Sequence, residues 1–164
     1  MPLTPVPAAV LLRPAAPSDQ DFLDALYLST RDDLQALAAD PALRPMIAAL
    51  IVMQQKAQAA SYQASYPGAA CLVIEHGGAP VGRAVVHADG AGLRLVDLSV
   101  LPAARRQGCA AGALAQFQRR AAAGAHALHL TVRLDNAGAR RLYQRLGFAL
   151  ISDDGLDAQM RWCP

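Results

Sequence analysis

The stretch that decides the fold leads from a strand into a helix: residues 100–112 read Val-Leu-Pro-Ala-Ala-Arg-Arg-Gln-Gly-Cys-Ala-Ala-Gly. Arg105 and Arg106 stand where the helix begins, although a helix N-terminus already carries a partial positive charge. A bound anion would turn this repulsion into attraction, and Gly108 would leave the N–H groups of the first turn accessible to it. The stretch therefore predicts a phosphate site at a strand-to-helix junction. The alternative interpretation is a solvated pair of arginines.

Gly112 adds a second observation, because it lies inside the Ala-rich helical run. A glycine there costs about 1 kcal/mol relative to alanine. We therefore expect another group, either a ligand or a packing partner, to approach the helix backbone closely. The stretch lacks the Gly-Lys-Ser/Thr of a P-loop and the GxGxxG of a dinucleotide site. It predicts a phosphate cradle of another design.

The composition fits one folded domain. Of the 164 residues, 54% are hydrophobic and 17% are charged, which is enough for one complete core. We expect a single domain over residues 1–164. The longest wholly apolar run, residues 46–53, is too short to cross a bilayer, and residues 1–12 lack the basic start of a secretory signal. These features predict a cytoplasmic protein that does not associate with membranes.

The cysteines argue against a structural metal. Cys71, Cys109 and Cys163 are widely spaced, and no Cys-x-x-Cys pair occurs. This pattern favours a reducing compartment and predicts no metal site.

Charge is distributed unevenly along the chain. Residues 101–152 contain eight arginines and one acid, which gives +7, whereas residues 1–100 carry −3 and residues 153–164 carry −2. This polarity predicts an anionic ligand on the basic half and suggests a cationic one on the other. The basic stretch lacks interleaved aromatic residues and a reader motif, so we expect no nucleic acid partner.

Apolar periodicity divides the chain into strands and helices. Ser18 and Asp21 resemble a capping box for the first helix, and aspartates at 32, 33 and 40 mark a loop after it. Antiparallel pairing is expected among the strands of residues 71–100. The expected strands are 9–13, at an edge, then 71–74, 81–86, 93–100, 128–132 and 159–162, and the expected helices are 19–30, 45–66, 108–123 and 136–146.

Two motifs now carry a family resemblance. Arg105-x-x-Gly108-x-Ala110 resembles the acyl-CoA signature of the GCN5-related N-acetyltransferases, the GNAT superfamily. Residues 130–148 read Leu-Thr-Val-Arg-Leu-Asp-Asn-Ala-Gly-Ala-Arg-Arg-Leu-Tyr-Gln-Arg-Leu-Gly-Phe and resemble its second signature. With the Leu-Arg-Pro-Ala start at residues 12–15, the resemblance extends over nearly the whole chain.

The resemblance implies the GNAT fold, an α/β (α+β) domain with a single mixed, mostly antiparallel central sheet of six to seven strands flanked by about four helices. It also implies acetyl-CoA as co-substrate and no metal. The main chain of three strand residues would hold the pantetheine arm and the thioester: Leu98, Ser99 and Val100. The pyrophosphate would lie on the loop and helix start formed by Arg105, Arg106, Gln107, Gly108, Cys109, Ala110 and Ala111.

Asn136 and Tyr143 complete the implied site. By the resemblance both contact the cofactor, and Tyr143 is placed to protonate the departing thiolate, since an ordinary phenol stays protonated near neutral pH. The plainer interpretations are a half-buried aromatic residue for Tyr143 and a helix N-cap for Asn136, which is compatible with a cofactor contact.

The resemblance does not identify the general base as clearly as it identifies the cofactor residues. Some family members carry a glutamate at the position that is Arg94 here. Asp97 remains, and strict alternation puts it on the face opposite Arg94, Val96 and Leu98. Asp97 could take the amine proton through a water or could stabilise a loop, and the loop role is slightly favoured.

The sequence leaves the acceptor open. The resemblance places the acceptor cleft beside a segment containing Asp32, Asp33, Asp40, Gln54, Gln55, Gln58, Tyr62 and Tyr66, which would suit a cationic amine, although a solvated loop and an ordinary helix explain these residues too. The implied function is acetyl transfer to a primary amine of a small molecule or a protein. The alternatives are a catalytically weak acyl-CoA-binding or regulatory module and, less favoured, an interaction domain. A homodimer is a further expectation.

Overall fold

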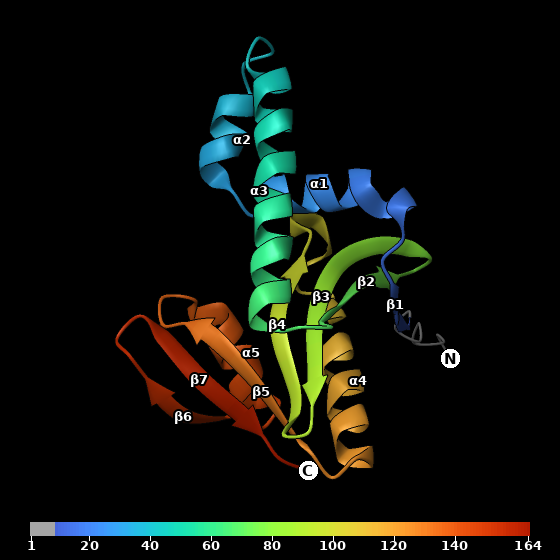
Figure 1. The fold of residues 1–164 in the computed structure, drawn as a ribbon, viewed down its shortest axis with the longest axis vertical. Coiled ribbons are helices and arrows are strands. Elements are labelled where there is room, and N and C mark those ends of the chain that lie inside the picture. Colours follow the sequence, from blue (N-terminus) through green and yellow to red (C-terminus); the bar gives the residue numbers. More distant parts are fainter. Residues whose placement is uncertain (1–8) are drawn as a thin grey trace, which may run out of the picture.

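The computed structural model describes residues 9–164, which contain seven strands in one sheet and five α-helices (Figure 1). The strands are β1 Val10–Pro14, β2 Ala70–His76, β3 Ala79–Asp89, β4 Gly92–Val100, β5 Ala127–Arg133, β6 Ala149–Asp153 and β7 Asp157–Trp162. The helices are α1 Gln20–Ser29, α2 Asp32–Ala38, α3 Arg44–Ser65, α4 Cys109–Ala123 and α5 Ala137–Arg145, with 3-10 turns at Pro17–Asp19 and Pro102–Ala104.

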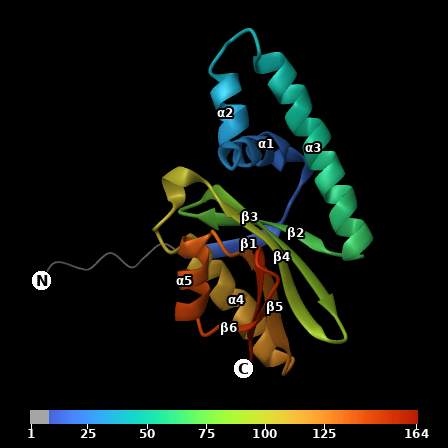
Figure 2. The same ribbon diagram turned by 90° about the vertical axis from the view of Figure 1, so that its left-hand side faces the viewer.

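The sheet order is β1-β2-β3-β4-β5-β7-β6. Every neighbouring pair is antiparallel except β4 and β5, which are parallel because α4 connects them. The mixed, mostly antiparallel sheet is therefore confirmed, and β1 lies at its edge as the sequence predicted. Figures 1 and 2 show α1, α2 and α3 on one face and α4 and α5 on the other.

The main core lies between the sheet and α4. Leu114 and Phe117 of α4 pack on strand residues such as Leu128 and Leu130, and all four are at most 2% exposed. Burying each of these side chains contributes about 1.5–3 kcal/mol. A separate cluster of Leu34, Ile47 and Ile51 joins α2 to α3. It holds the upper parts of these helices together where they extend beyond the sheet (Figure 1).

The helix count differs from the expected four because the segment predicted as a loop contains α2. Asp32 and Asp33 lie in the first turn of this helix, where acidic side chains favour helix formation. Leu34 is 3% exposed, so tertiary burial stabilises a seven-residue helix that is too short to be stable by itself.

The predicted capping box at the first helix is wrong. The carboxylate that accepts a backbone N–H is that of Asp19, which accepts from Ala16 at 2.7 Å and also pairs with Arg13. Strand β6 was missed, because all five of its residues are exposed and no apolar alternation marks it.

The close approach predicted at Gly112 exists, and the approaching group is a packing partner. A Cβ added to Gly112 would lie 2.8 Å from Cγ2 of Val10. The glycine therefore lets α4 pack tightly on the edge strand β1, and the packing interpretation is the correct one.

Candidate active site

The sheet opens between β4 and β5. The two strands pair only from Gly92 with Ala127 to Leu95 with Leu130. On the other side of β4, Val85 pairs with Asp97 and Val86 pairs with Leu95, so Val96 is an extra residue. Such a bulge bends its strand. β4 therefore diverges from β5 and leaves a cavity of about 150 Å³ lined by residues of both strands, Asn136 and Tyr143.

The bulge also changes which residues share a face. Leu95 and Leu98 both pack toward the core, although they are three positions apart. Asp97 and Arg94 both reach toward α3: Asp97 pairs with Arg83, which contacts Gln58 of α3, and Arg94 lies over the ring of Tyr66. The prediction from strict alternation is therefore wrong for Arg94 and correct for Leu98.

The loop before α4 presents a row of free backbone donors. Among the described residues, none of the six N–H groups from Arg106 to Ala111 donates a hydrogen bond. Arg106 and Gly108 take left-handed conformations, with φ of 63° and 80°, and this turns the chain into the helix start. Adjacent N–H groups in such a turn form an anion-binding concavity.

Two side chains of this loop bond to nearby backbone carbonyls. Nε of Arg105 donates to the carbonyl of Val100 at 3.1 Å, and Nε2 of Gln107 donates to Ala103 at 2.8 Å. Both bonds brace the loop. Cys109 is 2% exposed and burial raises the pKa of its thiol, so it is a packing residue at the helix start.

The open edge of β4 offers its main chain to the same region. The N–H of Leu101 donates to Val81 of β3 at 2.8 Å. Because these groups alternate along a strand, the main chain of Ser99 also points to β3, whereas Leu98 and Val100 point to the open side. Leu98, Ser99 and Val100 all line a groove of about 800 Å³.

This groove joins most of the predicted cofactor residues. It extends along the phosphate loop and β4 to Asn136 and Tyr143, and Gln107 is the one predicted cofactor residue outside its lining. Ser29, Thr30 and Asp32 form part of the opposite wall. No local sequence signal marks that wall, because these residues come from the α1–α2 junction and meet the groove only in the folded chain.

Asn136 is the N-cap of α5, as the sequence predicted, and its Oδ1 accepts the N–H of Ala139 at 3.1 Å. The side-chain NH₂ of Asn136 makes no hydrogen bond within the described residues, so capping leaves a donor for the groove. Asn136 can therefore cap α5 and contact a cofactor in the same conformation.

Tyr143 lies where the splay cavity meets the groove and lines both. It is 8% exposed, and its ring packs at 5.7 Å on Phe148. Burial first, and the nearby charge of Asp97 second, raise the pKa of the phenol to about 12. The hydroxyl is therefore protonated throughout the physiological range and can act as a hydrogen-bond or proton donor.

Asp97 forms an ion pair that the sequence did not reveal. Its Oδ2 accepts from Nη2 of Arg83 at 2.5 Å and from Nε of Arg83 at 3.2 Å. The two side chains are 23% and 13% exposed. Arg83 lies on the neighbouring strand, and only the register of β3 with β4 brings it here.

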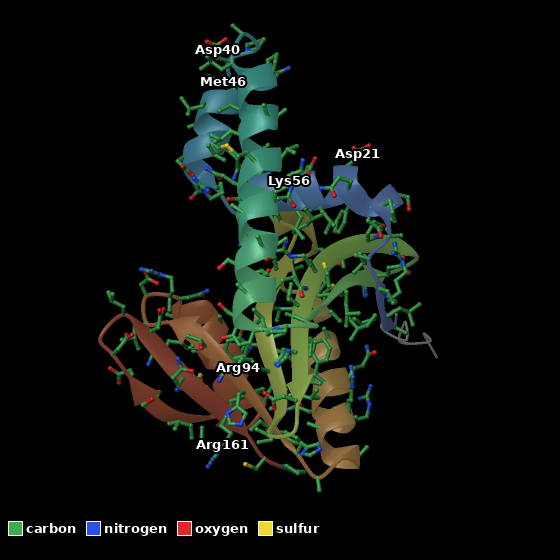
Figure 3. All side chains as sticks on the ribbon, in the orientation of Figure 1. Asp21, Asp40, Met46, Lys56, Arg94 and Arg161 are labelled. Atoms are coloured by element: carbon green, nitrogen blue, oxygen red, sulfur yellow. The ribbon has the colours of Figure 1, made fainter. Side chains whose placement is uncertain are left out.

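The predicted acceptor residues do not gather in one cleft. Asp32 lines the cofactor groove, whereas Gln55, Gln58 and Tyr62 line a different cavity of about 390 Å³ beneath α3. Asp40 lies at the far end of the α2–α3 projection (Figure 3). The others are engaged elsewhere: Asp33 with Arg31, Gln54 with Tyr27, and Tyr66 with His87 and Arg94.

Solved structures share this arrangement of sheet and helices. The PaiA N-acetyltransferase of Thermoplasma acidophilum, in complex with coenzyme A, matches with a TM-score of 0.68 and 14% identity over 95% of this chain and 99% of that chain. An acetyltransferase of Thermus thermophilus matches with a TM-score of 0.67 and 16% identity over 96% and 99%. The ribosomal-protein-alanine N-acetyltransferase of Brucella melitensis matches with a TM-score of 0.63 and 21% identity, over 94% of this chain and 99% of that chain.

These likenesses define the fold as that of the acetyltransferases. The sequence itself identifies the family: residues 28–148 match the model of the acetyltransferase (GNAT) family, and the chain belongs to this family. Its members share acetyl transfer as their general activity. Comparison with curated protein sequences gives no match.

Two further findings concern residues 9–164. No helix in this range is both long and apolar enough to cross a membrane. In the same range, no three His, Cys, Asp or Glu side chains are arranged as a metal site.

Proposed function

We propose that the protein transfers the acetyl group of acetyl-CoA to a primary amine by direct attack within a ternary complex. The observation that carries this proposal is the groove of about 800 Å³ that connects the free N–H groups before α4 with the hydroxyl-bearing end of Tyr143. One end suits a pyrophosphate, and the other suits a reacting thioester.

The phosphate end is built from backbone donors and arginines. Six N–H groups that have no partner among residues 9–164, the N-terminus of α4 and the side chain of Arg106 together favour two negative charges. The outward-pointing main-chain groups of Leu98 and Val100 can pair with the amides of a pantetheine arm as a strand would. Such pairing would direct the acyl end into the opening between β4 and β5.

The chemistry requires a nucleophile, a polarised carbonyl and a proton for the leaving group. The amine nitrogen bonds to the carbonyl carbon, the carbon–sulfur bond breaks, and the thiolate takes the proton of the Tyr143 hydroxyl. Solvent then reprotonates the phenolate. Because the pKa of Tyr143 is about 12, the hydroxyl keeps its proton and is available as a donor when negative charge develops on the leaving sulfur.

The amine also has to lose a proton. Asp97 borders the splay cavity, and its Oδ1 makes no hydrogen bond within the described residues, so a water could carry the proton to it. The ion pair with Arg83 occupies Oδ2 and orients the carboxylate. Asp97 thus combines an ion pair between two strands, in place of the loop contact that the sequence favoured, with the role of a candidate base acting through water.

Two observations favour a second candidate function. Arg94 occupies the position where some family members carry a glutamate, and Asp97 is bound by Arg83. A module that binds acyl-CoA with little turnover would fit these two features.

A thiol-release assay decides between the two functions. Purified protein would be incubated with acetyl-CoA and with polyamines, amino acids, aminoglycosides, lysine peptides or peptides with a free N-terminus. We expect amine-dependent release of coenzyme A, and weaker coenzyme A binding in Arg106→Gln. Tight binding without release for any amine would favour the binding module.

A further inference from the structure

Four basic side chains form a continuous row across one face of the sheet. His87 pairs with Arg94 between β3 and β4, Arg94 pairs with His129 between β4 and β5, and His129 pairs with Arg161 between β5 and β7. Directly paired residues project from the same face and lie side by side. We call His87, Arg94, His129 and Arg161 the basic row.

Acidic side chains do not balance this row. Within residues 9–164, no carboxylate forms an ion pair with Arg94 or Arg161, and Asp89 is 3.6 Å from His87 at one end. Arg133, four positions from His129 on β5, differs because it pairs with Asp135 at 3.0 Å. Arg94 and Arg161 lie on either side of His129 in the row, and a bound anion would supply the negative charge that neither guanidinium receives from a carboxylate of the described residues.

The electrostatic surroundings of His129 agree with this geometry. Burial is the largest cause that lowers the pKa of His129, and the charges of Arg94 and Arg161 lower it further. Asp89 acts in the opposite direction. A ligand that brings negative charge to the row would therefore raise the pKa of this imidazole.

The row is partly exposed, most fully at Arg161, and adjoins the splay cavity. Figure 3 shows Arg94 and Arg161 on the sheet face beyond the lower end of α3, where no helix covers the strands. Tyr66, just after α3, lies against both His87 and Arg94: its ring centroid is 5.7 Å from that of His87 and 6.0 Å from the guanidinium carbon of Arg94. Nη1 of Arg94 also lies 3.5 Å from Oγ1 of Thr131, which lines the cavity.

We propose that the basic row binds an acidic peptide segment next to the amine that receives the acetyl group. This inference rests on the transfer function proposed above and specifies its acceptor class. Four neighbouring strands spaced by about 4.8 Å make a row about 14 Å long. An extended peptide of about four to five residues has this length, with acidic side chains on alternate residues facing the cations.

The chemistry of the row favours a peptide over a nucleic acid. Bases need platforms for stacking, and the ring of Tyr66 is already engaged with His87 and Arg94, so this end of the row offers little free stacking surface. The amine of a peptide would also meet the splay cavity at Thr131, whereas an unmodified nucleic acid carries no primary aliphatic amine.

Binding would be measured with two fluorescent eight-residue peptides that share a free N-terminus and carry either glutamate or glutamine at alternate positions. The protein would be saturated with coenzyme A, and fluorescence anisotropy would give Kd. We expect the glutamate peptide to bind about 10-fold more tightly, and Arg94→Gln/Arg161→Gln to lose this preference. Arg119→Gln, which alters an exposed arginine of α4 on the other face, is the matched control.

Two further measurements test whether the peptide binds directly at the basic row. NMR titration should show the pKa of His129 rising when the glutamate peptide binds and staying unchanged with the glutamine peptide. A single-stranded oligonucleotide of equal charge should compete less effectively than the glutamate peptide. Equal Kd values for the two peptides, an unaffected double variant, or stronger competition by the oligonucleotide would each overturn the proposal.

Acetyl transfer to the same peptides distinguishes this proposal from the proposed function. We expect a higher kcat/KM for the glutamate peptide and a difference that vanishes in the double variant. Equal transfer to both peptides would overturn the acceptor assignment and leave acetyl transfer intact. Binding of the glutamate peptide through the row, combined with no thiol release from any amine, would contradict acetyl transfer and uphold the row as a peptide site.

Discussion

Replacing Tyr143 with phenylalanine removes a single hydroxyl from a ring that is 8% exposed. That hydroxyl makes no hydrogen bond within the described residues, so its loss should change the free energy of unfolding by less than about 1 kcal/mol. If it protonates the thiolate, kcat should fall by about 100- to 10,000-fold. Such a fall corresponds to about 2.7–5.4 kcal/mol in activation free energy.

The assay is thiol release with acetyl-CoA and the best amine from the acceptor screen, with Kd for coenzyme A measured separately. We expect Kd to stay within about threefold, because the lost interaction acts in the transition state. Since the pKa of Tyr143 is about 12, the wild-type rate should show no loss from its ionisation up to about pH 10.

Tyr62→Phe provides the matched control. Tyr62 is a half-buried tyrosine of α3 whose pKa is also raised to about 12, mainly by burial. Its substitution should leave kcat unchanged. A Tyr143→Phe enzyme that folds normally and keeps kcat within about threefold of the wild type would refute the assignment of Tyr143 as the proton donor.

Three further predictions concern stability. The Arg13 guanidinium lowers the pKa of Asp19 to about 2, so this pair stabilises the fold above about pH 4 and is lost as the pH falls toward 2. The urea midpoint of the wild type should therefore decrease over that pH range, and the midpoint of Asp19→Asn should decrease less. Equal decreases in the two proteins would contradict a stabilising pair. Gly112→Ala should lower Tm, because the added methyl group would collide with Val10. Adding Val10→Ala should restore Tm. A higher Tm for Gly112→Ala alone would refute the packing argument. Gly108→Ala should cost about 1–2 kcal/mol, because φ is 80° there while a Cβ would meet no neighbour, and Gly108→Asn should cost less if backbone strain is the cause.

The local sequence was sufficient for the parts of the site that depend on short stretches of chain. The free donors before α4 follow from a strand, a tight loop and a helix start within 13 residues. The cap at Asn136 is equally local, since its side chain bonds three positions ahead. Most strand and helix positions followed from apolar periodicity, because one buried face imposes a repeat that a single segment records.

The tertiary structure decided what depends on a partner segment. α2 forms because Leu34 is buried against α3, and the close approach at Gly112 comes from β1, about a hundred residues earlier. The bulge at Val96 is set by the register with β3, and it reverses the face predicted for Arg94 relative to Asp97.

The basic row separates the two kinds of information most clearly. The sequence contains its four members as scattered single residues on four strands, and it showed Arg94 as a departure from the family pattern. Strand order and register place them side by side. Periodicity determines which residues of one strand share a face, but hydrogen bonding between strands determines which residues of different strands become neighbours.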